Sequence, residues 1–274
     1  MTLVRRFIVL LFFVVCIFKL SNAQGEFAED RESLRYNVNQ FGAKVNTNGF
    51  GFVYTFAQRV TYRLRRNYEA EYDYVSSPKE VKMINSYFAS YSNNVKRFIF
   101  GKDNSVHNIR LGYGYNWMMF EKRDKNSVSI HLQANVGFSF AFEKPMYYEM
   151  VDSVTVFNNM ANYHYSRHRF EDYYTGKVSD IITKAPFSTG LNEIKVRPGN
   201  YIKLDFSFDF ARNAMIVSAI EVGGIVDLYY FPVTIMYNQP HNFMWSMYIA
   251  YQFGRKYNPT LNRDYRREQR KLQR

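Results

Sequence analysis

The chain has 274 residues, of which 47% are hydrophobic and 19% aromatic, and its formal net charge is +12. A mean hydropathy of -0.38 excludes a bundle of membrane-spanning helices, which would be far more apolar. The single cysteine, Cys16, excludes a disulfide framework and a thiolate zinc site.

The first residues predict a secretory signal peptide at 1–23. Arg5 and Arg6 precede an apolar stretch at 7–18, and Ala23 is the small residue expected before a cleavage site. The stretch is too short to cross a bilayer as a helix, which needs about 20 apolar residues. Removal of the signal peptide at 1–23 takes away three bases and leaves one domain with a net charge of +9. Although this domain is basic, a secreted chain would not meet nucleic acid, so we expect no nucleic-acid partner.

Strict alternation of apolar and polar residues indicates strands that separate two environments. In the clearest example, residues 201–210, the polar positions alternate with Ile202, Leu204, Phe206, Phe208 and Phe210. Successive side chains of a strand point to opposite faces, so one face of this strand is entirely apolar. The pattern recurs at 40–45, 50–62, 68–75, 109–119, 128–142, 216–231 and 243–253.

No second layer is available to cover so many apolar faces, and lipid is their natural contact. We therefore expect an all-β fold, an eight-stranded antiparallel transmembrane β-barrel at 39–253. Trp245, Tyr251 and Phe253 face lipid in the last strand, which ends like the aromatic signal that directs barrels to the outer membrane.

The connections predict the orientation of the barrel. Short connections are expected at 63–67, 121–126 and 211–214, and longer ones at 76–105, 143–198 and 233–242. In bacterial barrels the short turns are periplasmic and the long loops extracellular. We expect the outer membrane of a Gram-negative bacterium, with a periplasmic N-terminal segment at 24–38 and a basic periplasmic tail at 254–274.

The polar faces of these strands carry charges of both signs. A barrel of this size is filled by its own side chains, and enclosed charges must pair because an isolated buried ion is very costly. We expect a structural ion-pair network, with a proton path or narrow ion channel as the alternative. Its expected members are Lys44, Glu69, Glu71, Asp73, Arg110, His131, Lys203, Asp205, Asp209, Glu221 and Asp227.

No catalytic, cofactor or metal site is expected. His164, His168 and Asp172 are spaced by four residues and would share a helix face, as metal ligands can, but the aromatic and basic sequence around them does not favour a helix. His131 fits a hydrogen-bonded interior position. No HExxH, GxSxG or Gly-rich phosphate loop is present.

The two long loops are aromatic and are the expected docking regions for a partner. The loop at 76–105 has a possible helix start at 77–80, and the loop at 143–198 is far longer than closing two strands requires. The alternative is that both loops only cap their own barrel. Candidate docking residues are Tyr147, Tyr148, Phe157, Tyr163, Tyr165, Phe170, Tyr173 and Tyr174.

Several motifs resemble a family of small outer-membrane β-barrel proteins of Bacteroidota without an assigned activity. The resemblance covers residues 24–257 and rests on the processing site at 22–24 and on the runs at 35–52, 77–84, 97–102, 110–114 and 144–148. It implies a non-catalytic subunit of envelope machinery, such as the β-barrel assembly machine or the type IX secretion apparatus.

We therefore expect a docking subunit of a multi-protein outer-membrane complex. Its expected partners are outer-membrane lipid and other outer-membrane or periplasmic proteins, bound through the two long loops and the basic tail. One alternative is a stand-alone surface barrel whose loops bind an external ligand or host surface. The other is an outer-membrane lipid-modifying enzyme or protease.

Overall fold

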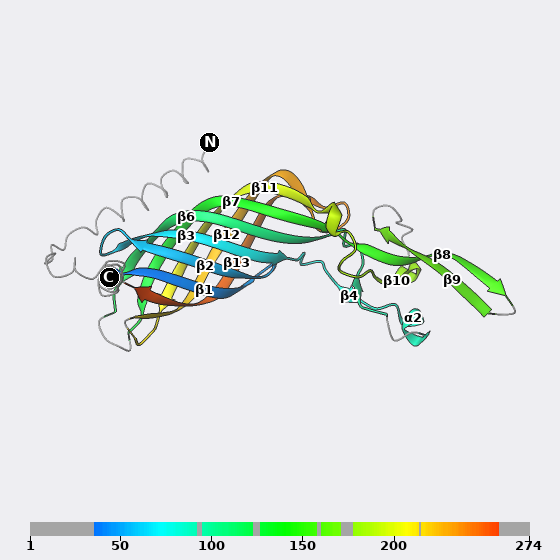
Figure 1. Ribbon diagram of the computed structural model, residues 1–274, viewed down its shortest axis with the longest axis horizontal. Helices are drawn as coiled ribbons and strands as arrows, with labels where there is room; N and C mark the ends of the chain where they lie inside the picture. The colour runs from blue at the N-terminus through cyan, green and yellow to red at the C-terminus, as the bar shows by residue number, and fades with distance from the viewer. Residues whose placement is uncertain are drawn as a thin grey trace, which may run out of the picture. The chain divides into compact units, whose positions relative to one another are not determined.

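The computed structural model describes residues 36–91, 95–122, 127–157, 160–170, 178–213 and 215–257. Eight strands of this part of the chain close into an antiparallel barrel in the order β1-β13-β12-β11-β7-β6-β3-β2. Barrel strands that follow one another in the chain are neighbours in the barrel, apart from the elements inserted in the two long loops (Figure 1). The expected fold class is confirmed.

The barrel strands are β1 (Asn37–Asn46), β2 (Gly49–Arg59), β3 (Leu64–Val75), β6 (Asn104–Phe120), β7 (Ser129–Pro145), β11 (Lys195–Asp209), β12 (Ile216–Thr234) and β13 (Pro240–Tyr257). The first long loop contains β4 (Lys82–Met83), α2 (Ser86–Tyr91) and β5 (Phe98–Ile99). The second contains β8 (Tyr147–Phe157), β9 (Met160–Arg169), β10 (Ile181–Lys184) and the short 3-10 helices η1 (Val178–Asp180) and η2 (Leu191–Glu193).

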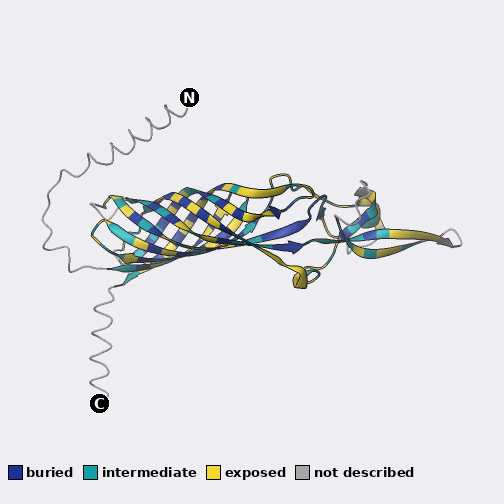
Figure 2. Cartoon of the chain, turned by 90° about the horizontal axis from the view of Figure 1, so that it is seen from above, coloured by how far each residue is buried: buried dark blue, intermediate teal, exposed yellow. Residues whose placement is uncertain are grey.

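Alternation along each barrel strand separates an outer apolar face from an enclosed polar one. In β11, Ile202 and Leu204 are 57% and 54% exposed, whereas the alternating residues Lys203 and Asp205 are each 1% exposed. Figure 2 shows the same alternation of buried and exposed residues around the barrel. Phe206, Phe210, Trp245, Tyr251 and Phe253 are also exposed, and Phe208 is half-buried. The apolar positions that we predicted to contact lipid therefore lie on the outside of the barrel.

The strands extend beyond the limits expected from the sequence. β7 reaches Pro145 and pairs with both β6 and β11, and β11 begins at Lys195, so the second long loop spans 146–194. β13 runs past Phe253 to Tyr257. The connection of β12 to β13, expected at 233–242, is only 235–239. Backbone pairing therefore continues where the apolar alternation stops, because ladder hydrogen bonds do not depend on lipid contact.

The interior of the barrel is layered. One apolar cluster, which includes Val75, Val106 and Tyr229, fills it at the end of the long loops. Another, formed by Val38, Ala57, Val217 and Ala219, fills it at the opposite end. Most of the charged side chains lie on the same inward faces, between the two clusters in strand position, whereas Asp209 lies opposite Ala219 of the second cluster. Side chains thus fill the lumen at both ends as well as in the middle.

The long loops fold outside the barrel. β10, β8 and β9 form a three-stranded sheet in that order, and β4 pairs with β5. The helix start expected at 77–80 is a turn, in which the Ser77 amide donates to Glu80, and α2 begins only at Ser86. No helix in the described residues is long and apolar enough to span a membrane.

Candidate functional site: the lumen network and the outer sheet

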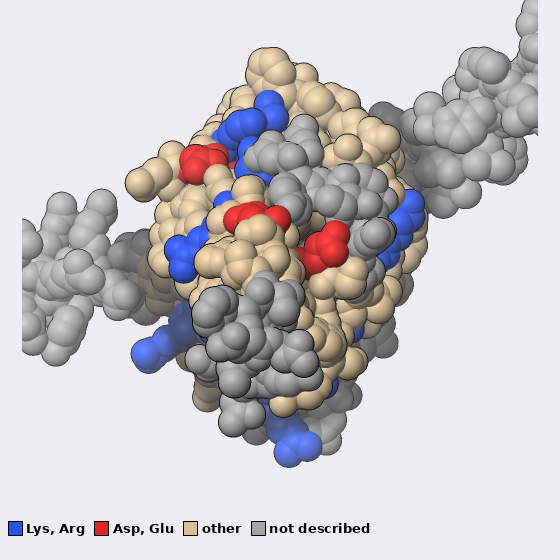
Figure 3. Space-filling view, turned by 90° about the vertical axis from the view of Figure 1, so that its right-hand side faces the viewer, with Lys and Arg blue, Asp and Glu red and all other residues tan. Residues whose placement is uncertain are grey.

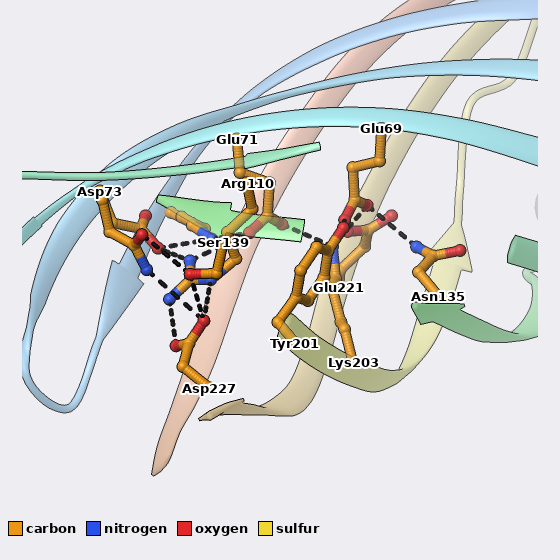
Figure 4. A network of polar contacts seen from close by, with 12 residues as sticks. Glu69, Glu71, Asp73, Arg110, Asn135, Ser139, Tyr201, Lys203, Glu221 and Asp227 are labelled. Atoms are coloured by element: carbon orange, nitrogen blue, oxygen red, sulfur yellow. Dashed lines mark hydrogen bonds and ion pairs between the residues drawn. The ribbon is translucent and has the colours of Figure 1, made fainter. Parts of the chain in front are cut away.

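Arg110 forms the most extensive contacts of the lumen. Its guanidinium binds Asp227 with two bonds, Nε to Oδ1 at 2.8 Å and Nη2 to Oδ2 at 2.7 Å. Nη1 also donates to Asp73, and to Oε2 of Glu71 at 3.2 Å (Figure 4). A planar guanidinium suits such paired contacts, which fix β3, β6 and β12 relative to one another.

Two lysines complete the pairing around Glu71. Lys44 Nζ lies 2.6 Å from Glu71 Oε2 and 3.0 Å from Asp73 Oδ2. Lys203 Nζ lies 2.8 Å from Glu71 Oε1 and 2.6 Å from Glu69 Oε2. Glu71 therefore contacts Lys44, Arg110 and Lys203 and is the centre of the network.

The remaining lumen residues are held mainly by hydrogen bonds. Glu221 accepts from the side-chain amides of Gln133 and Gln252, both at 2.8 Å. His131 contacts Asn116 Oδ1 at 3.0 Å through Nδ1. Nearer the end opposite the long loops, Lys122 and Lys256 lie 3.3 and 3.5 Å from the carboxylate of Asp209.

Asp205 differs from its neighbours. It is 1% exposed, and neither carboxylate oxygen accepts a hydrogen bond from the described residues. The other predicted members of the network are buried as well, at 5% exposure or less. Among these predicted members, Asp205 alone has no ion pair and accepts no hydrogen bond from the described residues.

A small residue at position 112 makes room for a large side chain in the lumen. Gly112 lies opposite Gly137 of β7, and a Cβ atom at Gly112 would overlap the hydroxyl of Tyr201. That hydroxyl donates to Glu69 at 3.3 Å. The large side chain of Tyr201 fills the space that glycine leaves.

The outer sheet is built on a core of its own. Phe98, Tyr148, Met150, Phe170 and Ile181 are buried together, so β5, β8, β10 and the residue after β9 form one unit. The hydroxyl of Tyr148 lies 2.7 Å from the carbonyl oxygen of Ile99 and 2.6 Å from that of Lys102. Burial raises the pKa of Tyr148 and keeps this hydroxyl a donor.

This core corrects two of the candidate docking residues. Tyr148 is 0% and Phe170 3% exposed, so both hold the outer sheet together and neither can meet a partner. Tyr147 is half-buried and its hydroxyl contacts the Glu193 carboxylate at 2.8 Å. The side chain of Phe157, and Tyr173 and Tyr174, lie outside the described residues.

An aromatic face remains exposed on the outer elements. Tyr163 and Tyr165 share one side of β9, and Tyr165 is 61% exposed. Tyr87 of α2 is 51% exposed, and its hydroxyl lies 2.6 Å from that of Tyr163. The ring of Phe88 packs edge-on to Tyr163 at 5.2 Å between centroids. We call Tyr87, Phe88, Tyr163 and Tyr165 the aromatic face.

The histidines of β9 do not lie on a helix. His168 Nε2 contacts both Asp152 Oδ1 at 2.9 Å and Ser166 Oγ at 2.5 Å. Both contacts use the same ring nitrogen, whereas in a catalytic triad the serine hydroxyl and the aspartate contact opposite nitrogens of the imidazole. Hydrogen bonds from Ser166 and His168 lower the pKa of Asp152. Asp172 lies outside the described residues.

Comparisons with known proteins find similar structures but no family. No protein-family model and no curated protein matches the chain. Neisserial surface protein A is 9% identical, with a TM-score of 0.38, over 81% of this chain and 96% of its own. Ail, the attachment invasion locus protein of Yersinia pestis, is 6% identical over 82% of this chain and 100% of its own. Its TM-score is 0.40 for the complex with the heparin analogue sucrose octasulfate and 0.38 for the other structure. Similarity at this level carries no information on function, and the resemblance to a Bacteroidota family stays a prediction.

Proposed function

We propose that the chain is a non-catalytic barrel of the outer membrane that docks a partner protein through the aromatic face. The observation that carries this proposal is the aromatic face outside a filled barrel, in which Tyr87 and Tyr165 are exposed and Phe88 and Tyr163 are half-buried. Tyr and Phe are enriched at the buried centres of protein interfaces, where rigid rings supply large contact areas.

The outer surface of the barrel supports the membrane location. A closed barrel satisfies every backbone group between neighbouring strands, which is a requirement for crossing lipid. Large exposed apolar side chains such as Phe138, Leu204, Trp245 and Ile249 cover its outside. All three connections at one end, 60–63, 121–128 and 210–215, are short, whereas both long loops lie at the other end. We therefore place the end with short connections, and both termini, in the periplasm.

The filled lumen supports a role outside the barrel. The 49-residue loop at 146–194 forms a separate sheet, and neither a pore nor a catalytic site in the barrel would require such a loop. Such a sheet suits a subunit of a multi-protein envelope complex, of the β-barrel assembly or type IX secretion kind. The basic tail at 258–274 lies outside the described residues, and its binding of a periplasmic partner stays a prediction.

Site-specific photo-crosslinking in living cells tests the docking. Full-length chains carry a benzophenone amino acid at Tyr165, with a control at Phe120, which is 63% exposed at the opposite end of the barrel. We expect one adduct of defined mass at Tyr165 that is absent at Phe120. Adding Tyr87→Ala should reduce its yield several-fold, since the aromatic face loses a central ring. Absence of a protein adduct at Tyr165 would instead favour a stand-alone surface barrel.

A further inference from the structure

A second feature of the long-loop end is a basic pocket of about 700 Å³. Its floor includes Tyr74, His107 and Lys144, which occupy outward-facing positions of β3, β6 and β7. Its walls come from the loop segments around β4, β5 and β10. The bases that line it are Lys82, Lys96, Arg97, Lys102, Lys144 and Lys184.

The pocket has a strong positive charge. No Asp or Glu lines it, and only Lys102 is paired, with Glu80 Oε1 at 2.7 Å. The other five bases form no ion pair with any described residue. Five cations around one hollow repel one another unless an anion enters. Figure 3, which looks onto this end, shows Lys and Arg side chains around the outline of the view.

Lys144 is the decisive member of this set. It is 4% exposed, and no described residue accepts a hydrogen bond from its ammonium group. Its contact is the ring of Phe187, 4.7 Å from Nζ to the centroid. A charge on a side chain that is enclosed to this extent is normally paired, because an ammonium group without an acceptor loses part of its solvation without compensation. An anion in the pocket would supply the missing acceptor.

The position of the pocket selects the source of that anion. Its floor is the outer wall of the barrel, directly above the outward rows that contain Tyr72 and Ile109, both more than one third exposed. If those rows contact lipid tails, the pocket lies at the level of the headgroups. We propose that it binds the phosphate group of a membrane-lipid headgroup in the outer leaflet. This inference rests on the proposed membrane location but not on docking by the aromatic face.

Binding to the purified full-length chain in detergent micelles tests the proposal. The probes are lipid A with both phosphates, lipid A with its phosphates removed, and inorganic pyrophosphate. We expect the phosphorylated lipid to bind at least about tenfold more tightly than either other probe, since charged hydrogen bonds and the acyl chains both contribute. Lys144→Gln with Lys184→Gln should weaken that binding by about a hundredfold, on the order of tenfold per base.

Lys195→Gln is the matched control, because Lys195 is exposed at the same end of the barrel but does not line the pocket. It should leave the affinity unchanged, and circular dichroism should show that each variant is folded. Three results would overturn the proposal: equal binding of both lipid forms, tighter binding of pyrophosphate or of a sulfated glycan, or equal losses in the double variant and the control.

Discussion

At the scale of single residues, three bases hold four carboxylates in the lumen, those of Glu69, Glu71, Asp73 and Asp227. Lys44, Arg110 and Lys203 each contact at least two acids, and Glu71 contacts all three bases. Charges in such a network are mutually dependent, because removing one leaves another buried without compensation. Most of this set was predicted from strand parity alone, since an inward position in a small barrel is a buried position.

Replacing Arg110 tests the strength of this network. Arg110→Met leaves Asp227 without its two-bond partner, so we expect the free energy of unfolding to fall by about 3–5 kcal/mol. Denaturant titration of the refolded barrel in lipid vesicles measures it. Lys195→Met, at an exposed position, should change the same quantity by no more than about 0.5 kcal/mol. A loss of similar size in both variants would contradict the assigned role of Arg110.

Asp205 and Glu71 form a contrasting pair. The carboxylate oxygens of Asp205 accept no hydrogen bond of ordinary length from the described residues, whereas Glu71 has three bases around it. Asp205→Asn should therefore lower the free energy of unfolding by less than about 1 kcal/mol, or raise it, because an uncompensated acid becomes neutral. Glu71→Gln should lower it by about 3 kcal/mol or more. The same vesicle titration compares them, and the reverse order would show that the pairing is misassigned.

At the scale of elements, the sequence predicted the barrel strands better than the loops. Alternation is strong where one face meets lipid and the other a filled lumen, as in β11. The outer sheet has no such contrast of environments, and a register shift between Val151 and Ser153 interrupts the pairing of β8 with β9. The sheet was therefore missed. The basic pocket was also beyond prediction, since Lys82, Lys144 and Lys184 come from separate segments that only the fold brings together.

The core of the outer sheet offers a test at this scale. Tyr148→Phe removes the donor to two buried carbonyl groups, which costs about 1–3 kcal/mol. We expect faster amide hydrogen exchange in β8 and β10, measured by mass spectrometry, and unchanged exchange in β12. Tyr165→Phe is the matched control, since no described residue forms a hydrogen bond with that exposed hydroxyl. Faster exchange throughout the barrel would mean that the outer sheet is not a separate unit.

At the scale of the whole molecule, the layered interior determines what the barrel can do. Apolar clusters occupy both ends of the lumen and paired charges the middle. We therefore expect no open path for water or ions, and we infer that the barrel anchors the elements outside it. If both proposals hold, function depends on the aromatic face, which is directed to protein, and on the basic pocket, which is directed to lipid.

Electrical recording tests the filled lumen directly. The purified barrel, inserted in a planar lipid bilayer, should give no conductance steps above those of protein-free lipid, because ion pairs and apolar clusters fill its interior. A porin recorded in the same bilayer provides the positive control. Stable single-channel steps from the wild-type chain would contradict the filled lumen and would restore the narrow-channel interpretation.

The docking role rests on whether the barrel exists alone in its native membrane. Native mass spectrometry of the full-length chain, extracted from that membrane in mild detergent, answers this most directly. We predict a particle containing one copy of this chain and at least one other protein in fixed stoichiometry, which Tyr163→Ala with Tyr165→Ala dissociates and Phe120→Ala leaves intact. A particle of one chain and lipid alone would contradict the account.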